Sequence, residues 1–295
     1  MSESRRMRTS VVVVNWNAGG ALEACLASLS GERAVADEII LVDNASQDGS
    51  VAAARVRAPW AQIIENPANL GFAGGANRGA AAATGDILLF LNPDAQVRPG
   101  AIGKLVDAFR AFPRAGIAGG GLVDARGRWQ PSAARFGPAS HLLLDTTLGR
   151  LPARWRRRPY VVDWVYGTFM AVRREVFREL GGFDPSYFCY GEDLDFCHRA
   201  ARRGVQVIVV PEAQAVHGTS PSATQRFGEG RMAAVVEGEL RFYARHGPWT
   251  AVVVFRGLAA AKFATKAALA AAAGRVGVAA RYASVVRACL SPVPS

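Results

Sequence analysis

Three short apolar runs near the start of the chain constrain its fold more than any other feature. They lie within Ser10–Trp16 (SVVVVNW), Glu38–Val42 (EIILV) and Asp86–Leu91 (DILLFL). Each is too short for a typical helix and consists of β-branched and aliphatic residues, so each predicts a strand buried on both faces. Segments with helical periodicity separate the runs. This alternation predicts the α/β class, with a parallel sheet covered by helices on both faces.

Beyond these three runs, the sequence continues to alternate between predicted helices and strands, and the alternation becomes less regular after Asp94. Further helices are predicted over Gly20–Ser30, Ser50–Arg57, Gly71–Ala83, Ala101–Phe112, Arg174–Leu180 and Asp193–Arg203. Further strands are predicted over Ala61–Ile64, Gly116–Val123, Val161–Val172 and Val205–Val210. Gly127–Arg158 has no clear periodicity and predicts loop and short helix. The sequence from Glu229 onward is helical and increasingly rich in alanine.

The net charge of +11 is concentrated at the end of the chain. Residues 240–295 contain eight Lys and Arg and no acidic residue, whereas residues 1–239 contain 27 basic and 24 acidic residues. A nearly neutral body with a basic tail does not match a nucleic-acid-binding protein, whose basic residues would cover the body, so we expect no nucleic-acid partner. An apolar fraction of 50% is enough for a sizeable core.

Cysteine usage and the absence of a long apolar segment suggest a cytoplasmic protein. The four cysteines match no zinc or redox spacing, and so few in 295 residues indicate a reducing compartment. The VVVV run is too short for the apolar core of a signal peptide. No run of about 18 uncharged apolar residues, the length that spans a bilayer, occurs.

Polar residues follow the apolar strands directly, at the edge of the sheet where α/β proteins bind ligands. Asn15 and Asn17 follow the first strand, Asp43 the second and Asp94 the fourth. A single aspartate at such a place is usually a turn or cap residue. Two carboxylates at one sheet edge, however, repel each other unless a cation or a donor-rich ligand lies between them.

A glycine-rich segment, Asn69–Gly79 (NLGFAGGANRG), opens the third predicted helix. Glycines at a helix N-terminus allow backbone N–H groups to approach an anion. The spacing matches neither the dinucleotide-binding fingerprint nor a P-loop. Close packing of helix on strand is the alternative explanation.

Three acids, Glu192, Asp193 and Asp195, begin the helix predicted from Asp193. Acids are common at helix N-termini because they complement the helix dipole. Carboxylates clustered beside aromatic residues also raise one another's pKa, which suits a general base. His217 follows a further apolar strand, where it is either a structural histidine or a metal ligand.

Taken together, six motifs in order resemble the family 2 glycosyltransferases, and among them the bacterial rhamnosyltransferase type. The motifs are VVVVNWN, EIILVDNASQDGS, NLGFAGGANRG, GDILLFLNPDAQV, GTFMAVRREVFRELGGFDPSYFCYGEDLDFCHRAARRG and VPEAQAVHG, and they run from Val11 to His217. The resemblance implies a GT-A fold with a mostly parallel central sheet over residues 1–228. A nucleotide-sugar half (about 9–98) would be fused to an acceptor half (about 99–228), with a helical, basic C-terminal region over 229–295.

The resemblance also implies a role for each matching residue. Asp193 occupies the position of the catalytic base, and Asp94 and His217 the positions of metal ligands. The residues implied to bind the nucleotide sugar are Asn15, Asn17, Asp43, Asn69, Gly71, Asn77 and Asp94. Those implied to lie near the acceptor or the transferred sugar are Gly167, Thr168, Glu192 and Asp195. The metal-binding D-x-D motif reads Asn92-Pro93-Asp94 here, so a single carboxylate would hold Mg²⁺ or Mn²⁺ weakly.

The function expected from this resemblance is inverting glycosyl transfer. A dTDP- or UDP-sugar, with rhamnose as the first choice of sugar, would donate to a glycan or lipid-linked acceptor in cell-envelope polysaccharide synthesis. The basic tail would attach the enzyme to the anionic inner face of the cell membrane, unless it packs as a helical pair on the body. Two alternatives are a sugar nucleotidyltransferase and a non-catalytic scaffold on the membrane surface. The first would need a cation in the loop after the first strand, and NWNAGG has none.

Overall fold

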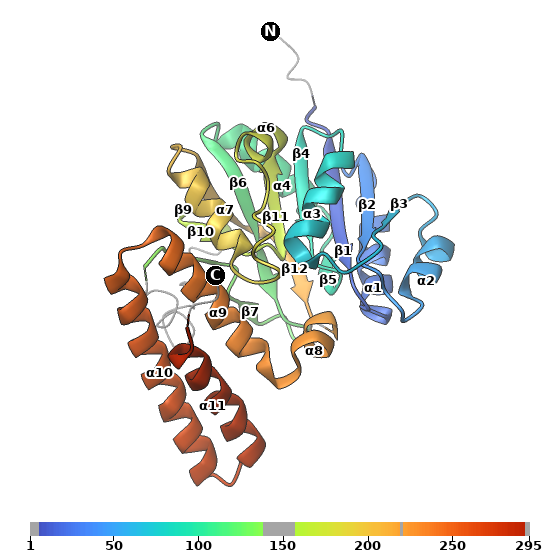
Figure 1. Ribbon diagram of the computed structural model, residues 1–295. Coiled ribbons are helices and arrows are strands. Elements are labelled where there is room, and N and C mark those ends of the chain that lie inside the picture. Colours follow the sequence, from blue (N-terminus) through green and yellow to red (C-terminus); the bar gives the residue numbers. More distant parts are fainter. Residues whose placement is uncertain (1–5, 138–156, 219–220, 293–295) are drawn as a thin grey trace.

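A ten-stranded mixed sheet forms the centre of the molecule in a computed structural model that describes residues 6–137, 157–218 and 221–292 (Figure 1). Its main strand order is β3-β2-β1-β4-β11-β6-β12-β5. These strands are β1 (Thr9–Asn15), β2 (Glu38–Asp43), β3 (Gln62–Glu65), β4 (Ile87–Leu91), β5 (Ala95–Val97), β6 (Ala115–Val123), β11 (Phe169–Arg173) and β12 (Gln206–His217). The short strands β7 (Trp129–Gln130) and β9 (Tyr160–Val162) pair with β6 and β12.

The first half of the sheet confirms the predicted alternation. Strands β1 to β4 are parallel, and every residue of β1 and β4 is buried. Alternate residues of β1 face opposite sides, Val11 and Val13 toward one core and Val12 and Val14 toward the other. The helices α1 (Gly20–Ser30), α2 (Ser50–Arg57) and α4 (Ala101–Ala111) cover the first side. The helices α3 (Gly71–Ala82), α6 (Arg174–Glu179) and α7 (Glu192–Ala201) cover the second.

The second half corrects two sequence predictions. Val161–Val172 is not one strand but β9, β10 (Trp164–Val165) and β11, because the chain turns at Gly167 before β11 enters the sheet antiparallel to β4. The strand predicted to end at Val210 continues through Pro211 to His217. A register shift against β6 between Val210 and Gln214 allows this, since a bulge tolerates the missing N–H of a proline.

The segment predicted as loop and short helix contains short strands where it is described. The described part forms β7 and β8 (Ala133–Ala134), and β8 pairs with β10 in a separate two-stranded sheet. Residues 138–156 of that prediction lie outside the described residues.

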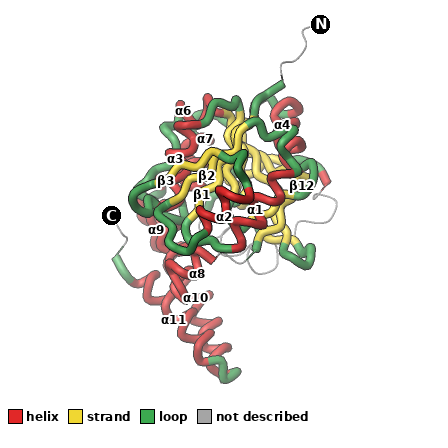
Figure 2. Tube along the Cα trace, turned by 90° about the vertical axis from the view of Figure 1, so that its right-hand side faces the viewer, coloured by secondary structure: helices red, strands yellow, loops and turns green. Residues whose placement is uncertain are grey.

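The predicted C-terminal helices are present and protrude from the body (Figures 1 and 2). After α8 (Pro221–Phe227), α9 (Arg231–His246) packs on α7, and α10 (Trp249–Ala272) and α11 (Val276–Leu290) form an antiparallel hairpin. Within the described ranges, no helix combines the length and apolar character needed to cross a bilayer.

Candidate active site

A cavity of about 470 Å³ opens at the sheet edge where β1 and β4 end and β11 begins. Elements distant in the sequence line it, including the ends of β1, β4 and β12, the start of α7, and α9. Its polar lining residues include Asn44, Asn69, Asn92, Gln130, Thr168, Glu192, Asp193, His217, Arg226, Arg231 and Glu239. Its aromatic lining residues are Trp16, Phe72, Trp164, Tyr166, Phe188, Tyr190 and Phe227.

Asp193 lies in the first turn of α7 and faces this cavity. Its Oδ2 accepts a hydrogen bond from the backbone N–H of Gly167 at 2.9 Å, which joins α7 to the start of β11. Burial raises the pKa of Asp193 to about 6, against the lowering effect of the N–H donors of Gly167 and Leu194. A pKa near 6 leaves a carboxylate at neutral pH that is more basic than an ordinary aspartate, as a general base requires.

Glu192 also lines the cavity, but its environment favours the neutral acid. It is 6% exposed, and its Oε2 has no hydrogen-bond partner among the residues that the structure describes. Burial, and then the charge of Asp193, raise the pKa of Glu192 well above its usual value. Burial thus favours the neutral acid in Glu192, while Asp193, with a pKa of about 6, is mostly ionised at neutral pH.

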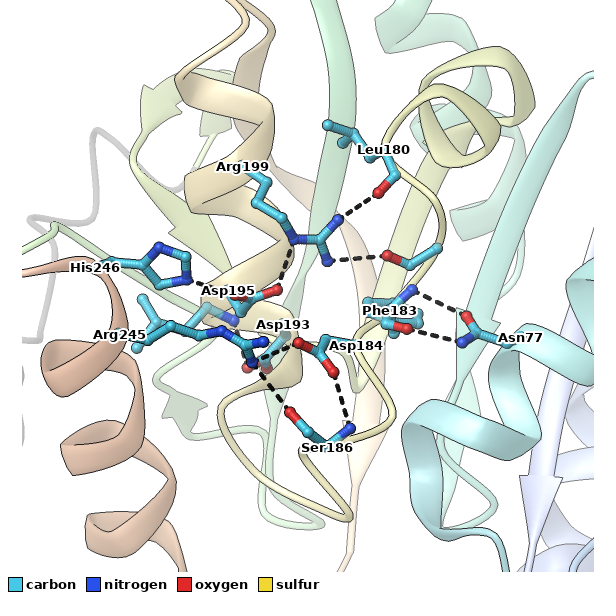
Figure 3. Close-up of polar contacts among 12 residues, drawn as sticks. Asn77, Leu180, Phe183, Asp184, Ser186, Asp193, Asp195, Arg199, Arg245 and His246 are labelled. Atoms are coloured by element: carbon cyan, nitrogen blue, oxygen red, sulfur yellow. Dashed lines mark hydrogen bonds and ion pairs between the residues drawn. The ribbon is translucent and has the colours of Figure 1, made fainter. Parts of the chain in front are cut away.

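Asp195, the third acid, is not among the residues that line the cavity. Its buried carboxylate accepts from Arg199 Nε at 2.7 Å and lies 2.6 Å from His246 Nε2, which belongs to α9 (Figure 3). Arg199 also donates to the carbonyl oxygens of Leu180 and Gly182 at 2.7 and 2.9 Å. Asp195 therefore joins α7, α9 and the loop after α6 and holds the helix that carries Asp193.

Strand pairing brings Asp94 and His217 together although 122 residues separate them in the sequence. His217 pairs with Ala95 in the β12–β5 ladder, and His217 Nε2 lies 3.4 Å from Asp94 Oδ2. The Nδ1 of His217 lies 3.0 Å from Gln130 Oε1, which fixes Nδ1 as the protonated nitrogen and leaves the Nε2 lone pair facing Asp94. Burial raises the pKa of Asp94 and lowers that of His217.

This pair fits a divalent metal ion. In the described part of the chain, both carboxylate oxygens of Asp94 and the Nε2 of His217 are buried without a hydrogen-bond partner. A carboxylate and an imidazole whose other nitrogen is anchored are suitable ligands for Mn²⁺ or Mg²⁺. No group of three or more His, Cys, Asp or Glu residues suited to a metal occurs in residues 6–137, 157–218 and 221–292. Substrate oxygens and water would have to complete the coordination.

The polar residues that follow β1 and β2 make contacts with one another. Asp43 is 2% exposed, and its carboxylate accepts from Asn15 Nδ2 at 2.8 Å and from the backbone N–H of Ser46 at 2.9 Å. Asn17 Oδ1 accepts from the backbone N–H of Gln47 at 2.7 Å. Asn15, Asn17 and Asp43 are not among the residues that line the cavity, whereas their sequence neighbours Val14, Trp16 and Asn44 are.

The glycine-rich segment reaches the cavity through its first residues only. Asn69 and Gly71 line it, and Gly71 has a φ of 72° and lies so close to the carbonyl of Phe188 that a Cβ atom would clash. Asn77, further along α3, instead exchanges two hydrogen bonds with the backbone of Phe183, at 2.8 and 2.9 Å (Figure 3). It connects α3 to the loop that precedes α7.

Several cavity residues were not identified from the sequence. Gln130 lies in the segment predicted as loop, and Arg231 and Glu239 lie on α9, in the region assigned to the tail. Arg231 Nε donates to the hydroxyl of Tyr190 at 3.0 Å, and its charge lowers the pKa of both Asp94 and His217. No local pattern marks these residues, because β-sheet pairing and helix packing bring them to the site.

Comparison with known proteins agrees with this architecture. The family model described as "Glycosyl transferase family 2" matches residues 10–181, and one described as "N-terminal domain of galactosyltransferase" matches residues 156–220. The chain is 34% identical to the N-acetylglucosaminyl-diphospho-decaprenol L-rhamnosyltransferase of Mycobacterium tuberculosis over 81% of this chain and 85% of that protein. It is 33% identical to a rhamnosyltransferase of Escherichia coli over 45% of this chain and 52% of that protein.

Solved structures show the same fold at low sequence identity. A mannosyltransferase from Pyrobaculum calidifontis, in complex with GDP-Man and Mn²⁺, has a TM-score of 0.60 and 20% identity and covers 97% of this chain and 88% of its own. GalNAc-T7 with UDP, GalNAc and Mn²⁺ has a TM-score of 0.59 and 18% identity, covering 82% of this chain and 51% of its own. The expected fold class, with its mostly parallel sheet and C-terminal helices, is confirmed. The chain belongs to glycosyltransferase family 2, and its activity is the transfer of a sugar residue.

Proposed function

We propose that this glycosyltransferase transfers L-rhamnose from a pyrimidine nucleoside diphosphate to a lipid-linked glycan acceptor in cell-envelope synthesis, with inversion at the anomeric carbon. The observation that carries the mechanism is Asp193, a carboxylate with a pKa of about 6 held at the cavity by the Gly167 amide. The sugar and the acceptor class rest on the similarity to the mycobacterial L-rhamnosyltransferase, whose name specifies a diphospho-decaprenol acceptor.

The proposed reaction is a single displacement. The carboxylate of Asp193 removes the proton of the acceptor hydroxyl while that oxygen attacks the anomeric carbon. The bond between the anomeric carbon and the diphosphate oxygen breaks, and its electron pair leaves with the nucleoside diphosphate. Because attack and departure occur on opposite faces of the sugar, the configuration inverts. The burial that favours the neutral form of Glu192 limits the negative charge beside the base.

The leaving diphosphate requires positive charge on its side of the cavity. Asp94 and His217 are the residues that would hold Mg²⁺ or Mn²⁺, which would offset the charge of the diphosphate. Arg231 lines the cavity, as His217 does, while Asp94 lies beside His217 outside the lining; Arg231 acts electrostatically on both and is the side chain we assign to the diphosphate oxygens. Asn69 and the backbone of Gly71 are assigned to the ribose and diphosphate, and Trp16 and Asn44 to the rim around the nucleobase.

The boundaries of the functional unit follow from these assignments. We propose that residues 1–228 form the glycosyltransferase domain, in a nucleotide-sugar half over 9–98 and an acceptor half over 99–228. We propose that the active site of this domain also includes α9, because Arg231 and Glu239 of α9 line the cavity. A lipid-linked acceptor would place the enzyme at the cytoplasmic face of the cell membrane.

A donor screen tests the proposed function. The full chain is incubated with dTDP- and UDP-sugars and Mg²⁺ or Mn²⁺, and release of nucleoside diphosphate is measured with and without a diphospho-polyprenol-linked N-acetylglucosamine acceptor. Acceptor-dependent release with dTDP-L-rhamnose, and a product of inverted anomeric configuration by NMR, support the proposal. Preference for another sugar nucleotide, or retention of configuration, contradicts it.

A further inference from the structure

The outward face of α10 carries no charge along the whole helix. The residues of α10 that are exposed to solvent are Trp249, Thr250, Val253, Val254, Gly257, Leu258, Ala261, Ala264, Thr265, Ala268, Leu269, Ala271 and Ala272. Trp249 and Leu269, near its two ends, are 74% and 67% exposed. Solvent-exposed helix faces are normally polar, so an uncharged face about 36 Å long requires a partner.

The opposite face of α10 is already packed, so the hairpin presents this outward surface in a fixed position. Phe255 and Phe263 are buried against α9 and α11, and Phe255 lies 5.1 Å, ring to ring, from Tyr243 of α9. Rotation of α10 would expose these rings. The apolar outward face is therefore a property of the folded hairpin.

Cations border the uncharged face, and α10 and α11 themselves contain no acid. Arg256, Lys262 and Lys266 emerge at its sides half-buried, and Lys266 Nζ lies within 6 Å of the rings of Phe263 and Tyr282. Arg275 and Arg287 are exposed on the turn and on α11. The last acidic residue in the sequence is Glu239. An apolar strip with cationic borders is typical of a helix that lies in the interface of a membrane.

We propose that α10 lies parallel to an anionic lipid bilayer, with Trp249, Val253, Leu258 and Leu269 in the headgroup region and the bordering cations on lipid phosphates. A second copy of the chain is a poorer partner, because a symmetric contact through α10 would bring the same cations together without an acid to balance them. An anionic membrane supplies that balance and accepts the apolar strip.

The role of this membrane contact in catalysis rests on the proposed function, in which the acceptor is lipid-linked. Because α10 and α9 pack together and α9 lines the cavity, binding of α10 to lipid holds the cavity at a fixed distance from the membrane that contains the acceptor. Membrane binding itself needs neither donor nor acceptor, so it is tested without turnover.

Vesicle sedimentation of the full chain tests the proposal. Vesicles of phosphatidylcholine alone are compared with vesicles of equal parts phosphatidylcholine and phosphatidylglycerol, at low and high salt. The double variant Val253→Gln, Leu258→Gln removes apolar surface, and Val56→Gln, 81% exposed on α2, is its matched control. Arg275→Gln removes a bordering cation, and Arg126→Gln, exposed in the turn between β6 and β7, is the corresponding control.

We expect salt-sensitive binding to the anionic vesicles only. The double variant should lower vesicle affinity at least tenfold, and Arg275→Gln about fivefold at low salt, with both controls unchanged. Equal binding to neutral vesicles, no binding, or an unchanged double variant overturns the proposal. So does a wild-type dimer in analytical ultracentrifugation that the double variant converts to a monomer. Release of nucleoside diphosphate without vesicles should be equal in all variants, which separates this test from that of the donor.

Discussion

At the scale of single residues, three acids at the start of α7 occupy three different environments. Glu192 is buried and favours its neutral form, Asp193 faces the cavity as a carboxylate, and Asp195 binds Arg199 and His246. A helix turns by about 100° per residue, so neighbouring acids point in different directions. Glu192 and Asp193 both line the cavity, and Asp193 is the one whose environment suits a general base.

Replacement of the proposed base should abolish turnover without loss of donor binding. We expect Asp193→Asn to lower kcat by about 10²- to 10⁴-fold, the usual contribution of a general base. The Kd for donor nucleotide, measured by calorimetry, should remain close to that of the wild type. Glu192→Gln is the adjacent control and should retain much more activity, because the environment of Glu192 favours its neutral form. Near-normal turnover of Asp193→Asn would contradict the assignment.

The raised pKa of Asp193 predicts the pH dependence of the reaction. Since only the carboxylate accepts a proton, kcat/KM for the acceptor should rise with pH and level off above about 6. The charge of Glu239 helps to raise the pKa of Asp193, so removal of that charge would shift the inflection downward. A rate profile that is flat between pH 5 and 8 would contradict the role of Asp193.

The raised pKa of Asp193 should make the folded protein less stable as the pH rises, whereas the reaction becomes faster. The folded state binds the Asp193 proton more tightly than the unfolded state, whose aspartate pKa is about 3.9. The favourable contribution is complete below that value and is lost as pH rises through about 6. Asp193→Asn should therefore raise the thermal midpoint at pH 8 more than at pH 4, as measured by calorimetry.

The proposed metal ligands predict a shared loss of function. Asp94→Ala and His217→Ala should each weaken Mn²⁺-dependent donor binding, and excess EDTA should reduce wild-type binding to the same level. Gln130→Met should weaken metal affinity by about 10- to 100-fold, because Gln130 fixes the imidazole orientation. Unchanged donor binding in EDTA would remove the metal from the mechanism.

At the scale of elements, the contacts around Asp195 attach α7 to α9. Arg199 is 25% exposed and shares the Asp195 carboxylate with His246. The Asp124–Arg128 pair has the same residue types and spacing, but its arginine is 70% exposed. A comparison of the two pairs therefore shows how burial changes the contribution of an Asp–Arg ion pair to stability.

We expect loss of the buried Asp195–Arg199 pair to lower the free energy of unfolding much more than loss of the exposed Asp124–Arg128 pair. Arg199→Met should lower the free energy of unfolding by about 3 to 5 kcal/mol, because it leaves Asp195 with less compensation. Arg128→Met should cost less than about 1 kcal/mol. Urea denaturation measures both values, and equal effects would contradict the role given to Asp195. In Arg199→Met, kcat should fall more than donor KM changes, since Asp193 lies on the helix that loosens.

At the scale of the whole molecule, one apolar core extends from the sheet to the protruding hairpin. Phe90 and Phe183 beside the sheet belong to the same buried cluster as Leu240 of α9 and Phe255 of α10. The hairpin therefore folds with the body although it extends beyond it in Figures 1 and 2.

This continuity predicts a single unfolding transition. Phe255→Ala should destabilise the protein by about 3 to 5 kcal/mol and shift the whole calorimetric transition. Leu258→Ala, one turn away and 43% exposed, should leave it nearly unchanged. Two separate transitions, of which only one responds to Phe255→Ala, would show that the hairpin folds independently.

The sequence by itself determined the positions of most strands and helices. The helices over Gly20–Ser30 and Ser50–Arg57 match their predicted bounds, and the apolar strands differ by one or two residues at their ends. The reason is local: strands buried on both faces need unbroken apolar runs, and amphipathic helices need a repeating apolar face. The order of strands also placed polar residues at one edge of the sheet.

Strand pairing and helix packing determine which of those polar residues face the cavity. The pairing of β12 with β5 places His217 beside Asp94. The packing of α9 on α7 brings Arg231 and Glu239 to the cavity, although the sequence assigned both residues to the C-terminal tail. The direction of a side chain depends on how its helix or strand is rotated against neighbours that are distant in sequence. Periodicity within one segment contains no information about that rotation, so the sequence did not show that Asp193 lines the cavity whereas Asp43 does not.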